Sequence, residues 1–133
     1  MTHYLNTIGA LFGAVLGAFF GGLSGLLIAL ICFMACDYLT GVISAIKRHK
    51  VNSNIGYWGI VKKCLILMLV GICNLLDKNI IGSGSICRTA CIMFYLSNDG
   101  ISILENLTEV GLPIPTKVKK VLEQLKEGEN DEG

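Results

Sequence analysis

The chain has 133 residues, of which 53% are hydrophobic and 16% are charged, and its formal net charge is only +1. So small a net charge argues against nucleic acid as a partner, because no strong positive field is present to attract it. Apolar segments fill most of the chain and leave no room for a separate soluble core. The composition predicts an all-α integral membrane protein.

One apolar run dominates the first half of the chain. From Tyr4 to Ile46 the only charged residue is Asp37. As a helix this run would measure roughly 64 Å, about twice the 30 Å hydrocarbon thickness of a bilayer. It is also far longer than the apolar core of a signal peptide, and Met1–Asn6 contains no Lys or Arg, so we do not expect a cleaved signal.

The run begins with a glycine stripe that repeats every four residues: Gly9, Gly13, Gly17, Gly21 and Gly25. Small residues at this spacing let two helix backbones approach closely inside lipid. The stripe predicts contact either between the first two segments of one subunit or between subunits of a homo-oligomer, and its length favours the oligomer. Each glycine weakens a helix by roughly 1 kcal/mol relative to alanine, so we expect the first segment to be the one that moves.

We predict four transmembrane helices, because the runs are long and unalternating and only helices or closed barrels satisfy the backbone in lipid. The membrane domain covers residues 1–110, with spans at about 5–20, 26–46, 60–76 and 86–104 and a turn at Gly21–Gly25. Alternatively, residues 5–46 form one long or tilted helix, which gives three spans and moves the N-terminus from the cytoplasm to the outside. In a third interpretation the first segment is amphipathic or mobile.

Basic residues are distributed unevenly between the two predicted sides of the membrane. Five flank one connection, namely Lys47, Arg48, Lys50, Lys62 and Lys63, and four more lie in the tail at Lys117, Lys119, Lys120 and Lys126. Only Lys78 and Arg88 fall on the other side. The positive-inside rule therefore places this connection and the C-terminus in the cytoplasm. Tyr57 and Trp58 lie where an interfacial aromatic belt is expected.

Three polar residues lie deep in the predicted spans: Asp37, Asn74 and Asp99. Asp37 lies about 15 Å along the helix from Lys47, near the bilayer midplane, where a charge costs about 2.5–3.5 kcal/mol on insertion scales. It either bonds a neighbouring polar side chain such as Asn74, or faces an aqueous lumen. The same two alternatives apply to Asp99 and Arg88, and the long side chain of Arg88 can also extend to the membrane interface.

The tail, residues 111–133, follows a break at Gly111–Pro115 that contains Pro113 and Pro115. Thr116 can then begin a short amphipathic cytoplasmic helix over about 116–126. Beside the basic residues this predicts a helix that lies on anionic lipid, or one that packs on the cytoplasmic connection. The acidic end, 127–133, is predicted to be disordered.

The sequence gives no indication of an enzyme, a cofactor or a metal site. It contains neither a nucleophile with a base nor a phosphate-binding loop. The six cysteines lie in apolar segments without metal-binding spacing, and we interpret them as packing residues: Cys32, Cys36, Cys64, Cys73, Cys87 and Cys91.

Several motifs resemble a family of phage lysis and toxin-secretion holins, of which the clostridial toxin-secretion holin is a familiar member. The similarity begins at Asp37 and Gly41 in Asp-Tyr-Leu-Thr-Gly, continues through Gly56 and Gly59 to Lys62-Lys63, and ends in Gly-Leu-Pro-Ile-Pro. It covers residues from about 37 to 125. The glycine-rich first segment is the part least similar to the family.

The resemblance implies a protein that accumulates in the cytoplasmic membrane of a bacterial host and assembles into lesions. Such lesions release an endolysin, or in some settings a large toxin, and lysis follows. The implied partners are the lipid bilayer, further copies of the chain, an endolysin without a stable complex, and an antiholin. Two other functions fit less well: an antiholin or regulatory paralogue with the same fold, and a small proton-coupled transporter that uses Asp37.

Overall fold

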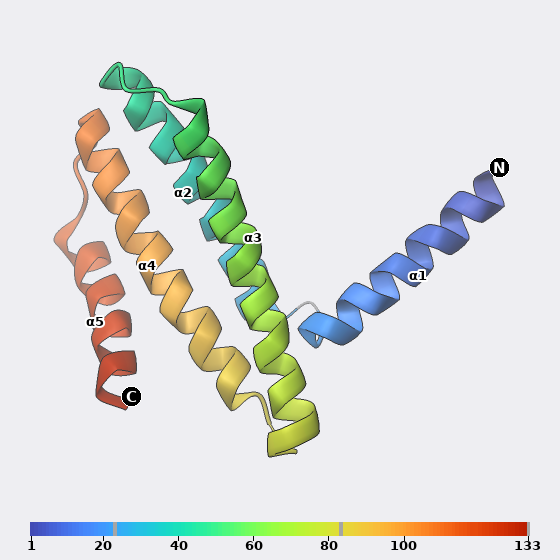
Figure 1. Cartoon of the computed structure of the whole chain (residues 1–133). Helices are drawn as coiled ribbons and strands as arrows, with labels where there is room; N and C mark the ends of the chain where they lie inside the picture. Colours follow the sequence, from blue (N-terminus) through green and yellow to red (C-terminus); the bar gives the residue numbers. More distant parts are fainter. Residues whose placement is uncertain (23, 83, 133) are drawn as a thin grey trace.

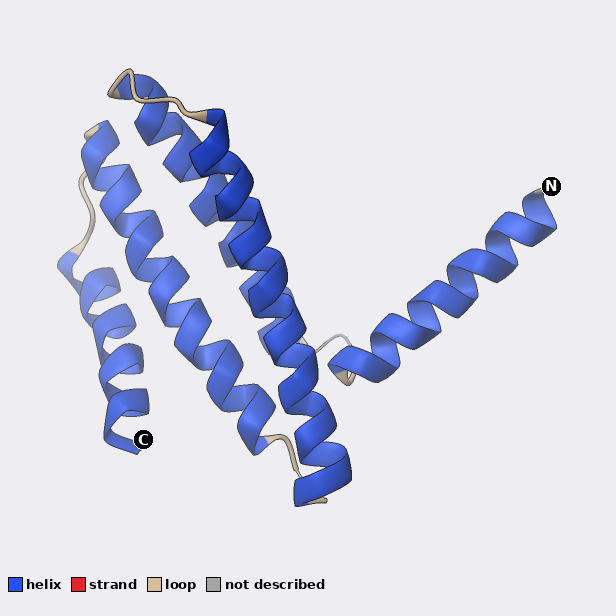
Figure 2. Cartoon of the chain, in the orientation of Figure 1, coloured by secondary structure: helices blue, strands red, loops and turns tan. Residues whose placement is uncertain are grey.

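The computed structural model describes residues 1–22, 24–82 and 84–132, and within these ranges every regular element is a helix (Figure 2). The predicted all-α class is confirmed. The elements in chain order are α1 Thr2–Phe20, α2 Gly25–Lys47, α3 Ser53–Leu76, the π-helical turn η1 Asp77–Ile81, α4 Ile86–Val110 and α5 Thr116–Glu132. Within the described ranges, three helices are long and apolar enough to cross a membrane: Thr2–Phe20, Gly25–Lys47 and Ser53–Ile81.

The predicted break between the first two segments is present, and the alternative of one continuous helix over 5–46 is wrong. Gly21 ends α1 with a φ of 79°, a left-handed conformation that glycine adopts without strain. Ser24 then begins α2, because its Oγ accepts a hydrogen bond from the backbone N–H of Leu27 at 3.2 Å. Leu23 lies outside the described residues.

The other helices extend beyond the predicted spans. α3 begins at Ser53 rather than near 60, because the Asn52 side chain accepts a bond from the N–H of Asn54 at 2.9 Å and caps it. α4 continues to Val110 rather than 104. The length of an apolar segment predicts how much of a helix lies in the lipid. The helix itself can be longer, because it continues until its terminal backbone groups are capped. α4 contains four charged residues and is not among the three helices that are apolar enough to span: Arg88, Asp99, Glu105 and Glu109.

Helices α2, α3 and α4 lie side by side in a bundle, with α2 and α4 parallel and α3 antiparallel to both (Figure 1). Its buried apolar core consists of Leu27, Leu30 and Met34 of α2, Val70 of α3, and Ile92 and Leu96 of α4. The connection 48–52 marks one end, called here the loop end. The turn η1 and the α1–α2 turn mark the other, called the η1 end. The core lies toward the η1 end, where α2 and α4 both begin.

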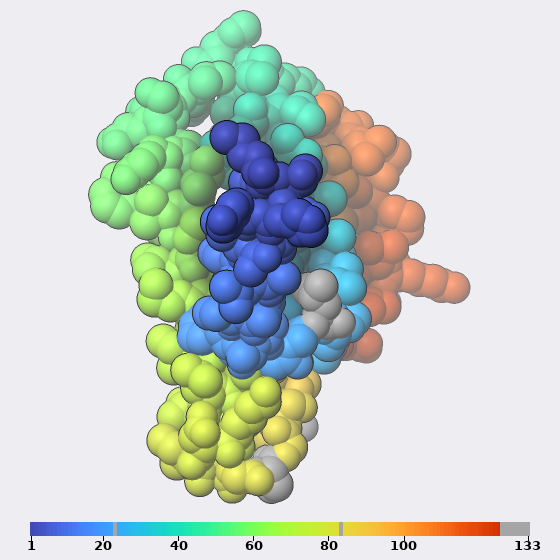
Figure 3. Space-filling view, turned by 90° about the vertical axis from the view of Figure 1, so that its right-hand side faces the viewer, coloured from blue at the N-terminus to red at the C-terminus, as the bar shows by residue number. Residues whose placement is uncertain are grey.

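Helix α1 projects from the bundle and has no buried residue (Figures 1 and 3). Its only packing, among the described residues, is on α3 through its last turns. There Asn74 donates hydrogen bonds to the carbonyl oxygens of Ala18 at 3.3 Å and Phe19 at 2.9 Å. The Phe19 ring covers Gly71, where a Cβ would collide with it.

Helix α5 folds back along α4 (Figure 1). Leu122 packs on Gly100, where an added Cβ would lie 2.8 Å from the Leu122 methyl and 3.2 Å from the Phe33 ring. The tail helix therefore contacts α4, an arrangement that neither sequence alternative described. It also continues to Glu132, past the predicted end at 126, and Gly133 lies outside the described residues.

Candidate functional site

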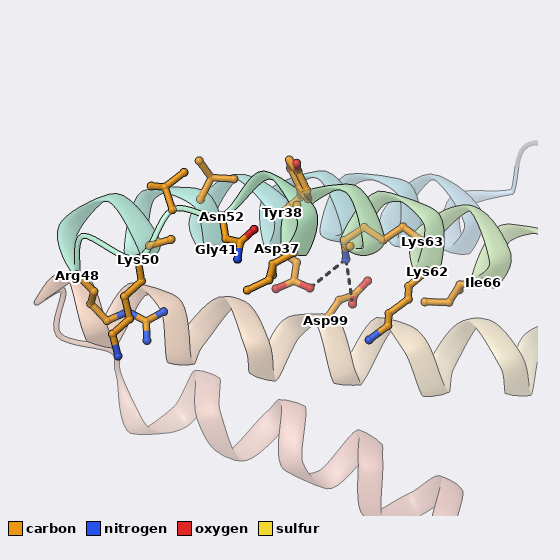
Figure 4. A pocket seen from close by; sticks show the side chains of 16 residues that line it. Asp37, Tyr38, Gly41, Arg48, Lys50, Asn52, Lys62, Lys63, Ile66 and Asp99 are labelled. Atoms are coloured by element: carbon orange, nitrogen blue, oxygen red, sulfur yellow. Dashed lines mark hydrogen bonds and ion pairs between the residues drawn. The ribbon is translucent and has the colours of Figure 1, made fainter.

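A groove of about 630 Å³ opens between α2 and α3 toward the loop end (Figure 4). The α2–α3 groove exists because α2 packs mainly on α4 and touches α3 little. Residues of the holin-like motif line it, among them Asp37, Gly41, Gly56 and Gly59. The structure thus brings together positions that are far apart in the motif and places them around one concave surface.

The centre of the groove is a charged cluster of three side chains from three helices. Lys63 Nζ of α3 lies 3.0 Å from Asp37 Oδ2 of α2 and 3.6 Å from Asp99 Oδ1 of α4 (Figure 4). All three are largely removed from solvent, with exposed side-chain fractions of 20%, 14% and 10% respectively. Pairing offsets much of the cost of placing charges at this depth. The sequence placed Lys63 on a basic surface, whereas it is the shared partner of both carboxylates.

Asn106 of α4 completes the polar shell around Asp37. Its Nδ2 donates to Asp37 Oδ1 and to the Asp37 carbonyl, both at 3.4 Å, and to Thr40 Oγ1 at 3.1 Å. Asn74, suggested from the sequence as a partner of Asp37, instead binds the end of α1. Sequence spacing could not identify Asn106, because the two residues meet only when α2 and α4 pack side by side.

One carboxylate oxygen of the charged cluster lacks a hydrogen-bond donor. Asp99 Oδ2 is buried and has no hydrogen-bond partner among the described residues. With two carboxylates and one ammonium, the cluster carries a formal charge of −1. A buried carboxylate oxygen without a donor is costly, so the cluster favours any rearrangement that brings it a proton, a cation or water.

The basic residues of the loop end divide into two groups. Lys47 Nζ donates to the last carbonyls of α4, Glu109 O at 3.2 Å and Val110 O at 2.9 Å, and Arg48 lies 3.4 Å from the Glu109 carboxylate. These two residues tie α2 to the end of α4. Lys50 and Lys62 line the α2–α3 groove and have no hydrogen bond or ion pair within the described part of the chain.

The η1 end contains a second polar cluster that the sequence analysis missed. The Asp77 carboxylate is buried and accepts the backbone N–H groups of Cys87 at 3.0 Å and Arg88 at 2.9 Å, which caps α4. The Arg88 Nη2 donates to Gly22 O at 3.2 Å and Ser24 Oγ at 3.1 Å. Arg88 is only 7% exposed, so in this structure it does not snorkel away from the bundle. The signal that could have found this cap is a lone acidic residue just before a short glycine-containing connection.

The fold and its internal charges define a small multi-pass membrane protein: three helices can span, and the ion pairs between helices are shielded from solvent. The chain belongs to the bacteriophage holin family, which residues 14–127 match. The resemblance found in the sequence is thereby confirmed.

One similar protein is named as a probable holin, and the others described here are uncharacterized. A protein named as a probable holin in Bacillus phage phi105 is 34% identical over 96 residues, covering 72% of this chain and 70% of the relative. An uncharacterized 14.9 kDa protein of Clostridium perfringens is 46% identical over 96 residues, covering 72% of this chain and 73% of the relative. An uncharacterized Listeria monocytogenes protein is 38% identical over 105 residues, covering 77% and 74%. No solved structure matches the chain.

Proposed function

We propose that the protein is a holin, which oligomerises in the cytoplasmic membrane of a bacterial host and forms a lesion that releases an endolysin or a large toxin. The observation that carries this proposal is family membership together with a long apolar helix, α1, that the subunit itself leaves uncovered. A membrane helix with an unpacked face of small residues is suited to contact a second helix. The protein is not proposed to be an enzyme.

The glycine stripe is the proposed assembly surface. At Gly9, Gly13 and Gly17 an added Cβ would meet nothing within 4 Å, so the subunit does not use these glycines for its own packing. Gly21 is different, since a Cβ there would collide with Asn74. The interpretation in which the first two segments pack along the whole stripe inside one subunit has no support, because α1 and α2 do not pack together in the described residues.

We further propose that Asp37, Asn74 and Asp99 face the lumen of the assembled lesion. In the single subunit these groups are held by partners on neighbouring helices, so assembly has to separate some of these contacts. The unpartnered Asp99 oxygen supports this proposal, because water in a lumen would supply the donor that the closed bundle lacks.

The proposed orientation is multi-pass with the loop end and the C-terminus in the cytoplasm. It follows the positive-inside rule, since the loop end holds Lys47, Arg48 and Lys50. If α4 crosses together with α2 and α3, four helices span and the N-terminus is also cytoplasmic.

The test is expression in a bacterium without endolysin, with membrane potential followed by a dye as cell mass rises. We expect an abrupt collapse at a reproducible time for the wild type, and lysis once a cytoplasmic endolysin is co-expressed. Gly13→Leu with Gly17→Leu should delay or abolish the collapse. These changes strengthen the helix by roughly 1 kcal/mol each and meet no neighbouring atom, so loss of function would reflect lost assembly and not misfolding.

The matched control is Leu11→Phe with Val15→Phe, which adds bulk to the opposite face of α1 and should leave the time of collapse nearly unchanged. Normal lysis by the glycine double variant would contradict the assembly surface. A steady potential in the wild type, with the protein recovered in membranes, would indicate an antiholin if co-expression delays a related holin. It would indicate a transporter if drug resistance rises instead.

A further inference from the structure

We propose that the charged cluster is a proton-binding site, in which Asp37 and Asp99 share one proton and Asp99 carries it. Asp99 is then a neutral carboxylic acid beside an ion pair between Asp37 and Lys63, at the junction of α2, α3 and α4 (Figure 4). The proposal concerns the folded subunit by itself. It does not depend on lesion formation, so it can fail or hold separately from the proposed function.

The balance of charges in the cluster is the first reason. One ammonium, Lys63, faces two carboxylates, so the ionised cluster keeps a formal charge of −1. A net charge is costly among apolar helices that are shielded from water. Binding one proton makes the cluster neutral and leaves the ion pair between Lys63 and Asp37 intact.

The unequal surroundings of the two carboxyl groups place the proton on Asp99. Asp37 has the shorter ion pair with Lys63, 3.0 Å against 3.6 Å, and Asn106 Nδ2 donates to its Oδ1 at 3.4 Å. Both contacts stabilise the ionised form of Asp37. Asp99 Oδ2 is buried without a donor among the described residues, and its side chain is only 10% exposed. Of two such neighbours, the carboxyl group with fewer donors holds the proton.

The proton on Asp99 also has an acceptor within reach. The side chains of Asp37 and Asp99 lie within hydrogen-bonding distance of each other. When both are ionised they are acceptors only, so they repel each other and form no bond. When Asp99 is protonated, its O–H donates to the Asp37 carboxylate. The proton therefore replaces a repulsion between α2 and α4 with a hydrogen bond.

The elements packed on α4 bring no second counter-charge to Asp99 within the described ranges. α2 contributes Asp37 and α3 contributes Lys63. α5 contributes the apolar side chain of Leu122. Asp77 of η1 bonds the first turn of α4, about 16 Å along the helix from Asp99. Three further cations line the groove without an ion pair to Asp99: Arg48, Lys50 and Lys62.

The α2–α3 groove lets this site exchange its proton with water. Asp37 and Asp99 both line the groove, which opens toward the loop end. At neutral pH the folded subunit holds a proton that the unfolded chain has released, so acid favours the folded state. This stabilisation is complete at acid pH and is lost as the pH rises and Asp99 ionises.

The test is infrared spectroscopy of the full chain in neutral detergent at neutral pH, with isotope-labelled aspartate. A protonated carboxyl group has a carbonyl stretch that ionised carboxylates lack. We expect one such band in the wild type, shifted by the label and absent in Asp99→Asn. It should also be absent in Asp37→Asn, because Lys63 then neutralises Asp99 alone. Lys63→Met should keep the band, since removal of the cation favours protonation.

The matched control is Glu105→Gln, which makes the same chemical change at an exposed position of α4 and should keep the band. A wild type without the band would overturn the proposal, as would a band that survives in Asp99→Asn. A band that survives in Asp37→Asn would show that the proton is not shared and would also contradict it. If Asp99→Asn does not fold, the labelled wild type and Lys63→Met still decide the matter.

Chemical unfolding at several pH values is the second measurement. Relative to Asp99→Asn, the unfolding equilibrium constant of the wild type should increase with pH, by at most about tenfold per pH unit for one proton. Glu105→Gln should follow the wild type. The same pH dependence in Asp99→Asn and the wild type would overturn the proposal. Stabilisation of the wild type by sodium and not by acid would make this a metal-cation site instead, which also overturns it.

Discussion

The two ends of the helical bundle differ in the kind of contact that holds their helices together. At the η1 end, Leu30, Val70 and Ile92 form a closed core and Asp77 satisfies the first N–H groups of α4. At the loop end, α2 and α3 separate around a groove, and the contact between helices is an ion-pair cluster with one carboxylate oxygen left unpartnered. The difference indicates that the η1 end is closed by apolar packing and a helix cap, whereas the loop end is closed by charged and polar contacts between helices.

The largest expected effect comes from removing the one cation of the charged cluster. Lys63→Met leaves Asp37 and Asp99 facing each other without a counter-charge, and we expect the free energy of unfolding in zwitterionic detergent to fall by about 3–5 kcal/mol. Lys62→Met, at the exposed neighbouring position, should cost less than 1 kcal/mol. Chemical unfolding followed by circular dichroism gives both numbers.

A double-mutant cycle sharpens this result. Adding Asp37→Asn to Lys63→Met removes one of the two stranded charges and should restore about 1–3 kcal/mol. If Lys63→Met is no worse than Lys62→Met, the loop end is not held by its ion pairs, and the contrast between the two ends is lost.

A smaller effect is expected at the η1 end. Asp77→Ala leaves the N–H groups of Cys87 and Arg88 unpaired in a buried position, which should cost about 2 kcal/mol. Lys78→Ala next to it, at an exposed position, should change stability by less than about 0.5 kcal/mol. Thermal unfolding of the two variants side by side is the measurement. Equal melting temperatures would show that the cap does not stabilise this end.

The smallest effect concerns α5, which covers the middle of α4 between the two ends. Leu122→Gln should weaken the contact with Gly100 by about 1 kcal/mol and speed amide exchange over residues 116–125 roughly fivefold. Val121→Gln, at an exposed neighbouring position, should leave exchange unchanged. Uniform exchange in both variants would mean that α5 does not depend on this contact.

Local features were predictable because their causes are local. The Gly21–Gly25 break follows from backbone freedom at glycine, and the end of α2 near Lys47 follows from the charges that leave the apolar run. The depth of Asp37 follows from the rise of a helix. The ends of helices α3 and α4 could not be predicted from the apolar spans, which begin near 60 and end near 104, because the caps at Asn52 and Gly111 determine where α3 begins and α4 ends.

The candidate site was only half predictable. Asp37 and Asp99 were identified as intramembrane carboxylates, and the basic residues of the loop end were identified as a group. Their pairing was not, since the bond between Lys63 and Asp37 requires α2 and α3 to be antiparallel in one register, and the bond from Asn106 requires α4 beside α2. Arg88 was identified as an intramembrane charge, but its partners were missed for the same reason, because they belong to the α1–α2 turn.

The sequence by itself determined that this is a helical membrane protein of the holin family, where its first turn lies, and which residues are costly to place in lipid. Apolar length, glycine spacing and the motif order carry that information along the chain. Only the tertiary structure decided that Lys63 is internal, that α1 stands apart from the bundle with its glycine face uncovered, and that α5 folds back on α4. Each of these depends on which helix faces meet, and helix packing in lipid is governed by the fit between surfaces, which hydrophobic patterning does not encode.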